Sequence, residues 1–190
     1  MIRIALVGSI GSGKTFISKL FGLPVFNADE SVAKIYSKKK KIYYDFKKKL
    51  PNLFTGFPIR KEELINAILK NKNNIKKISS IIHPEVRKDL NIFLKKNRKK
   101  KAILLDIPLY LENKLNKKND VIIFIETSNK EVLKRLKKRK NFNELVFQKL
   151  KKLQLSLNFK KSKSHYVIKN NFKKNLARKN ARDILDRILK

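Results

Sequence analysis

The sequence predicts an α/β fold, in which a five-stranded parallel sheet carries helices on both faces. Apolar runs of strand length alternate with stretches whose apolar residues recur at helical spacing. Hydrophobic residues make up 42% of the 190 positions, which is enough for one domain to bury roughly 70% of its unfolded surface. Three of the five glycines fall within six residues, directly after the first apolar run. That cluster marks a turn at which the backbone must adopt special geometry or approach a ligand closely.

Five short runs are expected to form the strands. Most are continuous and β-branched, as in strands that are buried on both faces of a parallel sheet. They are Ile2–Val7, Pro24–Phe26, Ala102–Leu105, Val121–Ile125 and Tyr166–Ile168.

The remaining periodic stretches are expected to be helical. A long, mostly helical region covers Asp29–Arg98, within which we expect Pro84 to start a new helix. The other predicted helices are Lys14–Phe21, Asn129–Arg139 and the amphipathic Asn175–Leu189. The long helical region exceeds a simple crossover between strands, so we expect a small helical subdomain near the carboxyl edge of the sheet, where ligands of such folds bind.

The chain is strongly basic, with 49 Lys and Arg against 15 Asp and Glu and a formal net charge of +34. Such an excess suits a nucleic-acid binder or a protein that handles polyphosphates. However, 40 of the cations are Lys and only 9 are Arg, whereas readers of phosphates and bases favour the bidentate Arg side chain. We therefore attribute most of the charge to compositional drift and expect no specific nucleic-acid partner.

Composition also excludes several classes of protein. No stretch approaches the roughly 18 apolar residues of a membrane span, and the N-terminus lacks the pattern of a signal peptide, so we expect a cytoplasmic protein without a membrane partner. The absence of cysteine excludes disulfides and thiolate metal sites. Two histidines are too few for a histidine-built metal centre, so any metal is expected to have oxygen ligands.

The glycine cluster matches the phosphate-binding pattern G-x-x-x-x-G-K-[ST]. Given this chain's composition, chance would produce roughly 0.002 such matches, and the motif stands between a predicted strand and a predicted helix. Backbone amides would wrap the phosphates, Lys14 would neutralise their charge, and Thr15 would hold Mg²⁺. The expected ATP-binding residues are Gly8, Ser9, Ile10, Gly11, Ser12, Gly13, Lys14 and Thr15.

Two carboxylates follow predicted strands. Asp106 ends a buried strand, where it would face Mg²⁺ or its bound water. Asp29 follows the second strand and could take the proton of an alcohol acceptor. The same residue could instead cap a helix, as could Asn27.

Several fragments in order resemble one family, the dephospho-CoA kinases. They are GSIGSGKT at 8–15, Asn27-Ala28-Asp29, HPEVR at 83–87, DIPLYLE at 106–112, RLKKR at 135–139, Gln154 and HYVIKN at 165–170. Together they cover nearly the whole chain. The resemblance implies a fold of the P-loop nucleotide-kinase type, with a core of residues 1–30, 100–134 and 161–190. It also implies a helical acceptor-binding insertion at about 31–99 and a lid at about 135–160.

The resemblance further implies ATP-dependent phosphorylation of the 3′-hydroxyl of dephospho-CoA, with Mg²⁺. Asp29 would be the general base, with Lys14 and Arg139 as the other catalytic residues. Lys14 and Thr15 would serve ATP and Mg²⁺, while Asp106 would lie beside the metal and the reacting phosphates. Arg135 and Arg139 would come from the lid and offset phosphate charge. The implied acceptor contacts are Arg60, His83, Asp106 and Glu112.

Some positions depart from the family pattern, and two other functions remain open. Asn27 stands where the family has Asp, Ser9 replaces a glycine, and Lys149 replaces a common Arg. The alternatives are another small-molecule kinase of this type, such as a nucleoside monophosphate kinase, and a basic nucleic-acid-binding protein regulated by ATP. The sequence is also compatible with a homo-oligomer.

Overall fold

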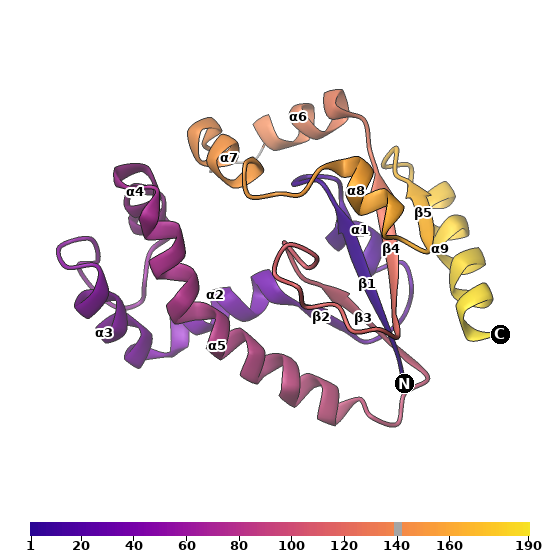
Figure 1. Ribbon diagram of the computed structural model, residues 1–190, viewed down its shortest axis with the longest axis horizontal. Coiled ribbons are helices and arrows are strands. Elements are labelled where there is room, and N and C mark those ends of the chain that lie inside the picture. Colours follow the sequence, from indigo (N-terminus) through magenta and orange to yellow (C-terminus); the bar gives the residue numbers. More distant parts are fainter. Residues whose placement is uncertain (139–141) are drawn as a thin grey trace. The chain divides into compact units, whose positions relative to one another are not determined.

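The computed structural model describes residues 1–138 and 142–190 and contains one parallel sheet of five strands (Figure 1). The strand order is β2-β3-β1-β4-β5, and each neighbouring pair is parallel. The strands are β1 (Ile2–Gly8), β2 (Val25–Asn27), β3 (Ala102–Asp106), β4 (Asp120–Glu126) and β5 (Tyr166–Lys169). The predicted fold class is therefore confirmed. No strand end differs from its predicted position by more than one residue.

The helices lie in the connections between the strands, except for the last one, which follows β5. They are α1 (Lys14–Ser18), α2 (Ala28–Lys38), α3 (Lys40–Lys49), α4 (Lys61–Lys70), α5 (Asn73–Lys96), α6 (Asn129–Lys137), α7 (Glu144–Lys151), α8 (Leu157–Ser162) and α9 (Lys174–Leu189). Among the residues described, no helix combines the length and the apolar composition that crossing a bilayer demands.

The chain divides into two compact units. The first contains Met1–Asn27, Asn97–Phe142 and Leu150–Lys190, and the second contains Ala28–Lys96 and Asn143–Lys149. The first unit therefore holds the whole sheet, and the second is helical.

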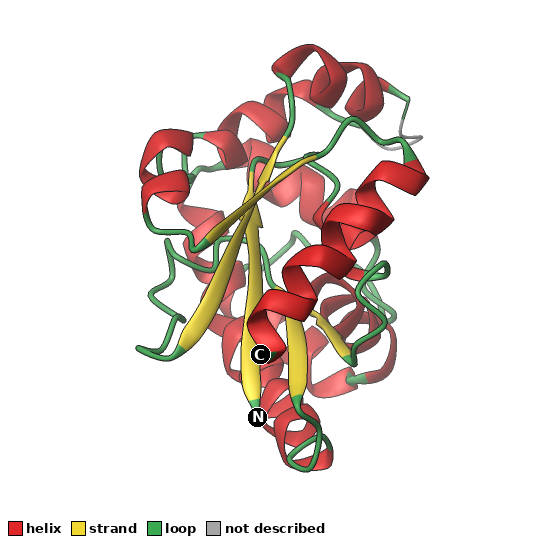
Figure 2. Cartoon of the chain, turned by 90° about the vertical axis from the view of Figure 1, so that its right-hand side faces the viewer, coloured by secondary structure: helices red, strands yellow, loops and turns green. Residues whose placement is uncertain are grey.

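The core of the first unit lies between one face of the sheet and two helices. Helix α9 contributes Ala177, Ala181 and Ile184, which recur at helical spacing and so share one face. Helix α1 contributes Ile17 to the same cluster, which includes alternate strand residues such as Ile4 and Leu6. Figure 2 shows α9, which ends at the C-terminus, crossing in front of the strands.

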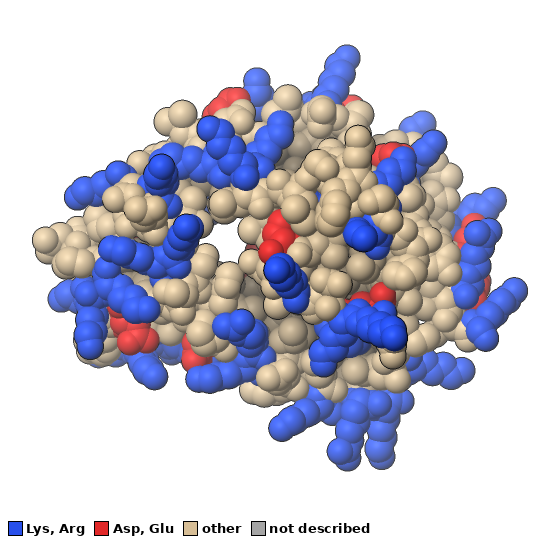
Figure 3. All heavy atoms as spheres, in the orientation of Figure 1, with Lys and Arg blue, Asp and Glu red and all other residues tan. Residues whose placement is uncertain are grey.

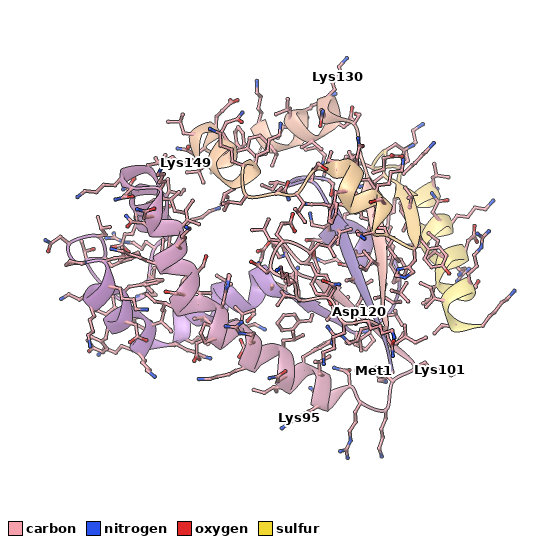
Figure 4. The ribbon with its side chains drawn as sticks, in the orientation of Figure 1. Met1, Lys95, Lys101, Asp120, Lys130 and Lys149 are labelled. Carbon is pink, nitrogen blue, oxygen red and sulfur yellow. The ribbon has the colours of Figure 1, made fainter. Side chains whose placement is uncertain are left out.

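A buried polar network closes the amino end of the sheet. Arg3 pairs with Asp120 (Nε to Oδ1, 3.1 Å) and donates a 2.9 Å hydrogen bond to the hydroxyl of Tyr110, which in turn donates to Asp120. Burial and, after it, the Asp120 carboxylate raise the pKa of Tyr110, so its hydroxyl stays a donor. Asp120 lies at the same end of the sheet as Met1 and Lys101 (Figure 4), opposite to the strand ends that ligands of such folds use.

The second unit is built around an apolar core that α2, α3, α4 and α5 share. Phe46 and Phe54 stack with their ring centroids 4.6 Å apart. Helix α5 continues through Pro84, so the prediction that a new helix starts there was wrong. Burial of Ile78 and Ile82, which lie in the two helical turns before Pro84, offsets the roughly 3 kcal/mol that an internal proline costs.

The ion pairs of Glu85 make the stability of the second unit depend on pH. Its carboxylate accepts hydrogen bonds from Lys39 at 2.7 Å and Lys88 at 2.6 Å. These bonds, that from Lys39 foremost, lower the pKa of Glu85 from 4.5 to about 2. Because the folded-state pKa is depressed, the stabilisation is complete above pH 4.5 and is lost as the pH falls towards 2.

We predict that Glu85→Gln lowers the free energy of unfolding at pH 7 by about 1–2 kcal/mol, after allowance for solvent screening of a pair that is partly exposed. The difference from the wild type should shrink as the pH falls from 4.5 to 2. Urea unfolding across this range measures it, with Glu62→Gln on α4 as a matched control. A difference that does not change with pH would contradict the assignment.

Candidate active site

The phosphate-binding loop spans residues 9–13, between the end of β1 and the start of α1. Gly13, which precedes the helix, has a φ of 88°, in the left-handed region that L-residues with side chains disfavour. A Cβ on Gly13 would lie 2.4 Å from Nδ2 of Asn170 and 2.7 Å from the ring of Phe172. Glycine is thus required here both by backbone conformation and by packing.

Side chains from two strand ends hold this loop. The carbonyl of the buried Ser12 accepts hydrogen bonds from Oγ1 of Thr127 at 3.0 Å and Nδ2 of Asn170 at 2.8 Å. Thr127 follows β4 and Asn170 follows β5. Asn170 is only 4% exposed, and its side-chain Oδ1 accepts a hydrogen bond from the backbone amide of Phe172 at 3.0 Å. Because the Ser12 carbonyl is turned into the protein, the curve of the loop is set by the sheet.

The loop lysine lies over the loop itself. Nζ of Lys14 donates to the carbonyls of Ser9 at 2.9 Å and Gly8 at 3.4 Å. The helix that follows is shorter than predicted: α1 ends at Ser18, whereas the prediction extended it to Phe21. A helix of five residues has a small dipole, so anion binding here depends mainly on the loop amides and on Lys14.

Three oxygen- or nitrogen-bearing side chains converge at the carboxyl end of β3. Oδ2 of Asp106 accepts hydrogen bonds from Oγ1 of Thr15 at 2.6 Å and from Nδ2 of Asn27 at 3.0 Å. Asp106 is 4% exposed, and Asn27 stands opposite it in the β2–β3 register. The predicted proximity of Thr15 and Asp106 is thus present in the structure.

The Thr15 and Asp106 pair has the chemistry of a magnesium site. Mg²⁺ prefers hard oxygen ligands and usually takes one or two from the protein, with the rest from water and substrate phosphates. A hydroxyl and a carboxylate whose oxygens are 2.6 Å apart, next to the phosphate-binding loop, suit that pattern. Among the described residues, no group of three or more His, Cys, Asp or Glu side chains forms an alternative metal site.

Of the two arginines predicted for a lid, Arg135 is on α6 and Arg139 lies outside the described residues. The guanidinium of Arg135 is 3.8 Å from the ring centroid of Phe172, a cation–π contact. Phe172 also packs against Phe16, with ring centroids 6.5 Å apart. Arg135 is therefore tied to the segment that follows β5 and that contacts Gly13.

The predicted base and two predicted acceptor residues belong to the second unit. Asp29 is exposed in the first turn of α2. Arg60 directly precedes α4 and donates to Oγ1 of Thr55 at 2.9 Å. His83 is on α5, where partial burial and, after it, the charge of Arg87 lower its pKa below 6.5, so the imidazole is neutral at pH 7.

Glu112, the remaining predicted acceptor residue, lies in the first unit. Its Oε1 pairs with Nζ of Lys160 at 2.7 Å and accepts the amide of Leu155 at 3.1 Å. The structure thus places Glu112 against α8 and the segment before it.

The family model of dephospho-CoA kinase matches residues 2–175. The chain belongs to the dephospho-CoA kinase family. A member from Wolbachia pipientis is 30% identical over 188 residues, covering 96% of both chains. The fold agrees with solved structures: a protein from Thermus thermophilus superposes with a TM-score of 0.79 at 20% identity, covering 98% of this chain and 97% of that one. The dephospho-CoA kinase of Campylobacter jejuni gives 0.64 at 22% identity, covering 98% and 96%.

Four residues at the site of this family member were not among the predicted site residues: Asn27, Thr127, Gln154 and Asn170. Asn27, Gln154 and Asn170 lay within the fragments that carry the family resemblance, but Asn27 by itself suggested a helix cap and Asn170 a turn. Gln154 accepts the amide of Ile10 in the loop at 3.3 Å. Thr127 gave no signal in the sequence.

We predict that Gly13→Ala reduces ATP binding at least tenfold and lowers the thermal unfolding temperature, because the new methyl group must displace Asn170 or Phe172. Gly22→Ala is the matched control: Gly22 also has a positive φ, of 66°, but a Cβ there meets nothing within 4 Å. The control should cost only backbone strain, about 1 kcal/mol, and leave ATP affinity intact. Calorimetric titration with ATP and thermal unfolding separate the two effects, and equal losses of ATP affinity would refute a packing role for Gly13.

Proposed function

We propose that this chain transfers the γ-phosphoryl group of ATP to the 3′-hydroxyl of dephospho-CoA, giving CoA and ADP. The observation that carries the proposal is the Thr15–Asp106–Asn27 cluster beside the phosphate-binding loop. The cluster connects Thr15 and Asp106, which are expected to serve ATP and Mg²⁺, with Asn27, which lies two residues before the proposed base.

The donor half of the site is built by the first unit. The loop amides and Lys14 bind the phosphates of ATP, and the Ser12 carbonyl is kept out of the phosphate path by Thr127 and Asn170. Thr15 and Asp106 would hold Mg²⁺, which when bound neutralises charge on the β- and γ-phosphates. Arg135 and Arg139 supply further positive charge from the lid.

Asp29 acts as the general base for the acceptor alcohol. It lies two residues beyond Asn27, so their Cα atoms are at most about 7 Å apart. Asn27 is in turn bonded to Asp106. Covalent connection therefore keeps the Asp29 carboxylate in the neighbourhood of the metal-binding residues, where it accepts the proton of the 3′-hydroxyl and orients its oxygen for in-line attack.

The residues assigned to the acceptor are those that the family resemblance implies: Arg60, His83, Asp106 and Glu112. A neutral His83 offers one donor and one acceptor to a polar group of the acceptor. On the face shown in Figure 3, Lys and Arg side chains are distributed over the surface rather than gathered in one patch. That distribution favours a general positive field, which attracts two polyphosphate substrates, over a dedicated nucleic-acid interface.

Acceptor specificity tests the function. In a coupled assay of ADP release with Mg²⁺ and ATP, dephospho-CoA should support turnover, while AMP, CMP and shikimate should give less than about one hundredth of its kcat/KM. Turnover with AMP or CMP but not with dephospho-CoA would indicate a nucleoside monophosphate kinase and overturn the proposal.

The role of Asp29 is tested by Asp29→Asn. We expect kcat to fall by about 10²–10⁴, the usual contribution of a general base, with little change in the KM for ATP. Glu30→Gln removes the adjacent exposed carboxylate of α2 and should retain kcat within about threefold. A loss of less than tenfold in Asp29→Asn, or an equal loss in both variants, would exclude Asp29 as the base.

A further inference from the structure

Within the first unit, two successive residues of the segment that follows α7 form hydrogen bonds with other parts of the unit. Oε1 of Gln154 accepts the amide of Ile10 at 3.3 Å, and the amide of Leu155 donates to Oε1 of Glu112 at 3.1 Å. One attachment is therefore to the phosphate-binding loop, and the other is to the connection between β3 and β4. Because the two residues are adjacent, fixing Leu155 restricts where the side chain of Gln154 can reach.

Glu112 is itself fixed by a buried cation. The same oxygen that accepts the Leu155 amide lies 2.7 Å from Nζ of Lys160, and the two side chains are only 9% and 3% exposed. A buried carboxylate needs such a partner, since an uncompensated charge in the interior is strongly destabilising. The amide of Leu155 supplies a further hydrogen bond, which fixes the geometry of the pair more tightly than charge alone.

Ile10 is the second residue of the loop, and its peptide orientation affects the amides that follow it. A phosphate cradle works only if several successive N–H groups point inwards before the ligand arrives. The amide of Ile10 donates a hydrogen bond to the side chain of Gln154. The segment that precedes α8 therefore holds the first part of the loop. Thr127 and Asn170 hold its later part at Ser12.

We propose that Gln154, Glu112 and Lys160 are positioning residues for ATP binding. The Glu112–Lys160 pair holds residue 155, residue 155 sets the place of Gln154, and Gln154 holds the Ile10 peptide so that the loop amides that follow it point inwards. This inference rests on the proposed use of ATP, and it gives Glu112 a role beyond the acceptor contact that the family resemblance implied.

A neighbouring ion pair provides a matched control. Lys161 pairs with Glu126, also at 2.7 Å, but these side chains are 48% and 33% exposed. Surface pairs of this kind contribute little. Replacing either lysine by methionine removes one positive charge from α8 and keeps most of the side-chain volume.

The experiment measures the Kd of Mg-ATP by calorimetry, together with steady-state kinetics and thermal unfolding. Loss of one hydrogen bond of ordinary strength predicts a three- to tenfold weaker Kd for ATP in Gln154→Ala. Lys160→Met should weaken ATP binding at least as much. The KM for ATP should rise in parallel in both variants, while kcat at saturating ATP changes less than about threefold.

Three further variants identify positioning as the cause. Lys160→Arg keeps the charge and should restore ATP affinity to within about twofold of the wild type, and Lys161→Met should leave it unchanged. In the double variant Gln154→Ala/Lys160→Met, the Kd should be no weaker than that of the worse single variant, because both changes release the same contact.

Several results would overturn the inference. If Lys160→Met lowers the unfolding temperature but leaves the Kd of ATP unchanged, the ion pair is structural only. Multiplying losses in the double variant would show that Gln154 and Lys160 act separately. Should Lys160→Met fail to fold, the half-buried Gln154 still decides, since unchanged ATP affinity in Gln154→Ala refutes the proposal. A wild-type protein that does not bind Mg-ATP would instead refute the proposed function.

Discussion

The structure of the site depends on how the phosphate-binding loop is tied to the carboxyl ends of the strands. The Ser12 carbonyl receives one hydrogen bond from Thr127 and one from Asn170. These two residues follow Glu126 and Lys169, which are partners in the parallel register of β4 and β5. The sheet register therefore determines where the two donors lie, and the donors hold the Ser12 carbonyl turned into the protein.

A second register produces the metal-binding side of the site. Asn27 and Asp106 are partners in the pairing of β2 with β3, and the Asp106 carboxylate also accepts the hydroxyl of Thr15. Since Asp106 is nearly inaccessible to solvent, its charge acts on its surroundings through a low dielectric and strongly favours a cation. Asn27, where the family usually has Asp, makes a neutral hydrogen bond with Asp106 and so avoids placing a second carboxylate beside it.

The sequence predicted those parts of the molecule that local pattern specifies. Apolar runs identified the five strands, and helical spacing identified helices between them. The glycines of the loop marked the phosphate site because few other residues tolerate the positive φ values found there. Helix limits were predicted less well: α1 is three residues shorter than expected and α5 passes through Pro84, since tertiary packing of Ile78 and Ile82 outweighs the local cost.

The long-range contacts could not be predicted from residue types alone. Gln154 and Ile10 are 144 positions apart, and Asn170 and Ser12 are 158 apart, so only the fold brings them together. Thr127 is an ordinary residue after a strand until Ser12 is placed beside it. The buried Lys160 is equally hard to identify among 40 lysines, because no pattern in the sequence separates it from lysines that face solvent.

The central claim is that phosphoryl transfer ends on the 3′-oxygen of dephospho-CoA. Its most direct test is ³¹P NMR of the products formed from Mg-ATP and dephospho-CoA, with the phosphorus of the product located by its coupling to the ribose protons. The account predicts one new phosphomonoester on the ribose 3′-position and an equal amount of ADP. Release of inorganic phosphate without a new ester, or a phosphoryl group on any other position, would contradict it.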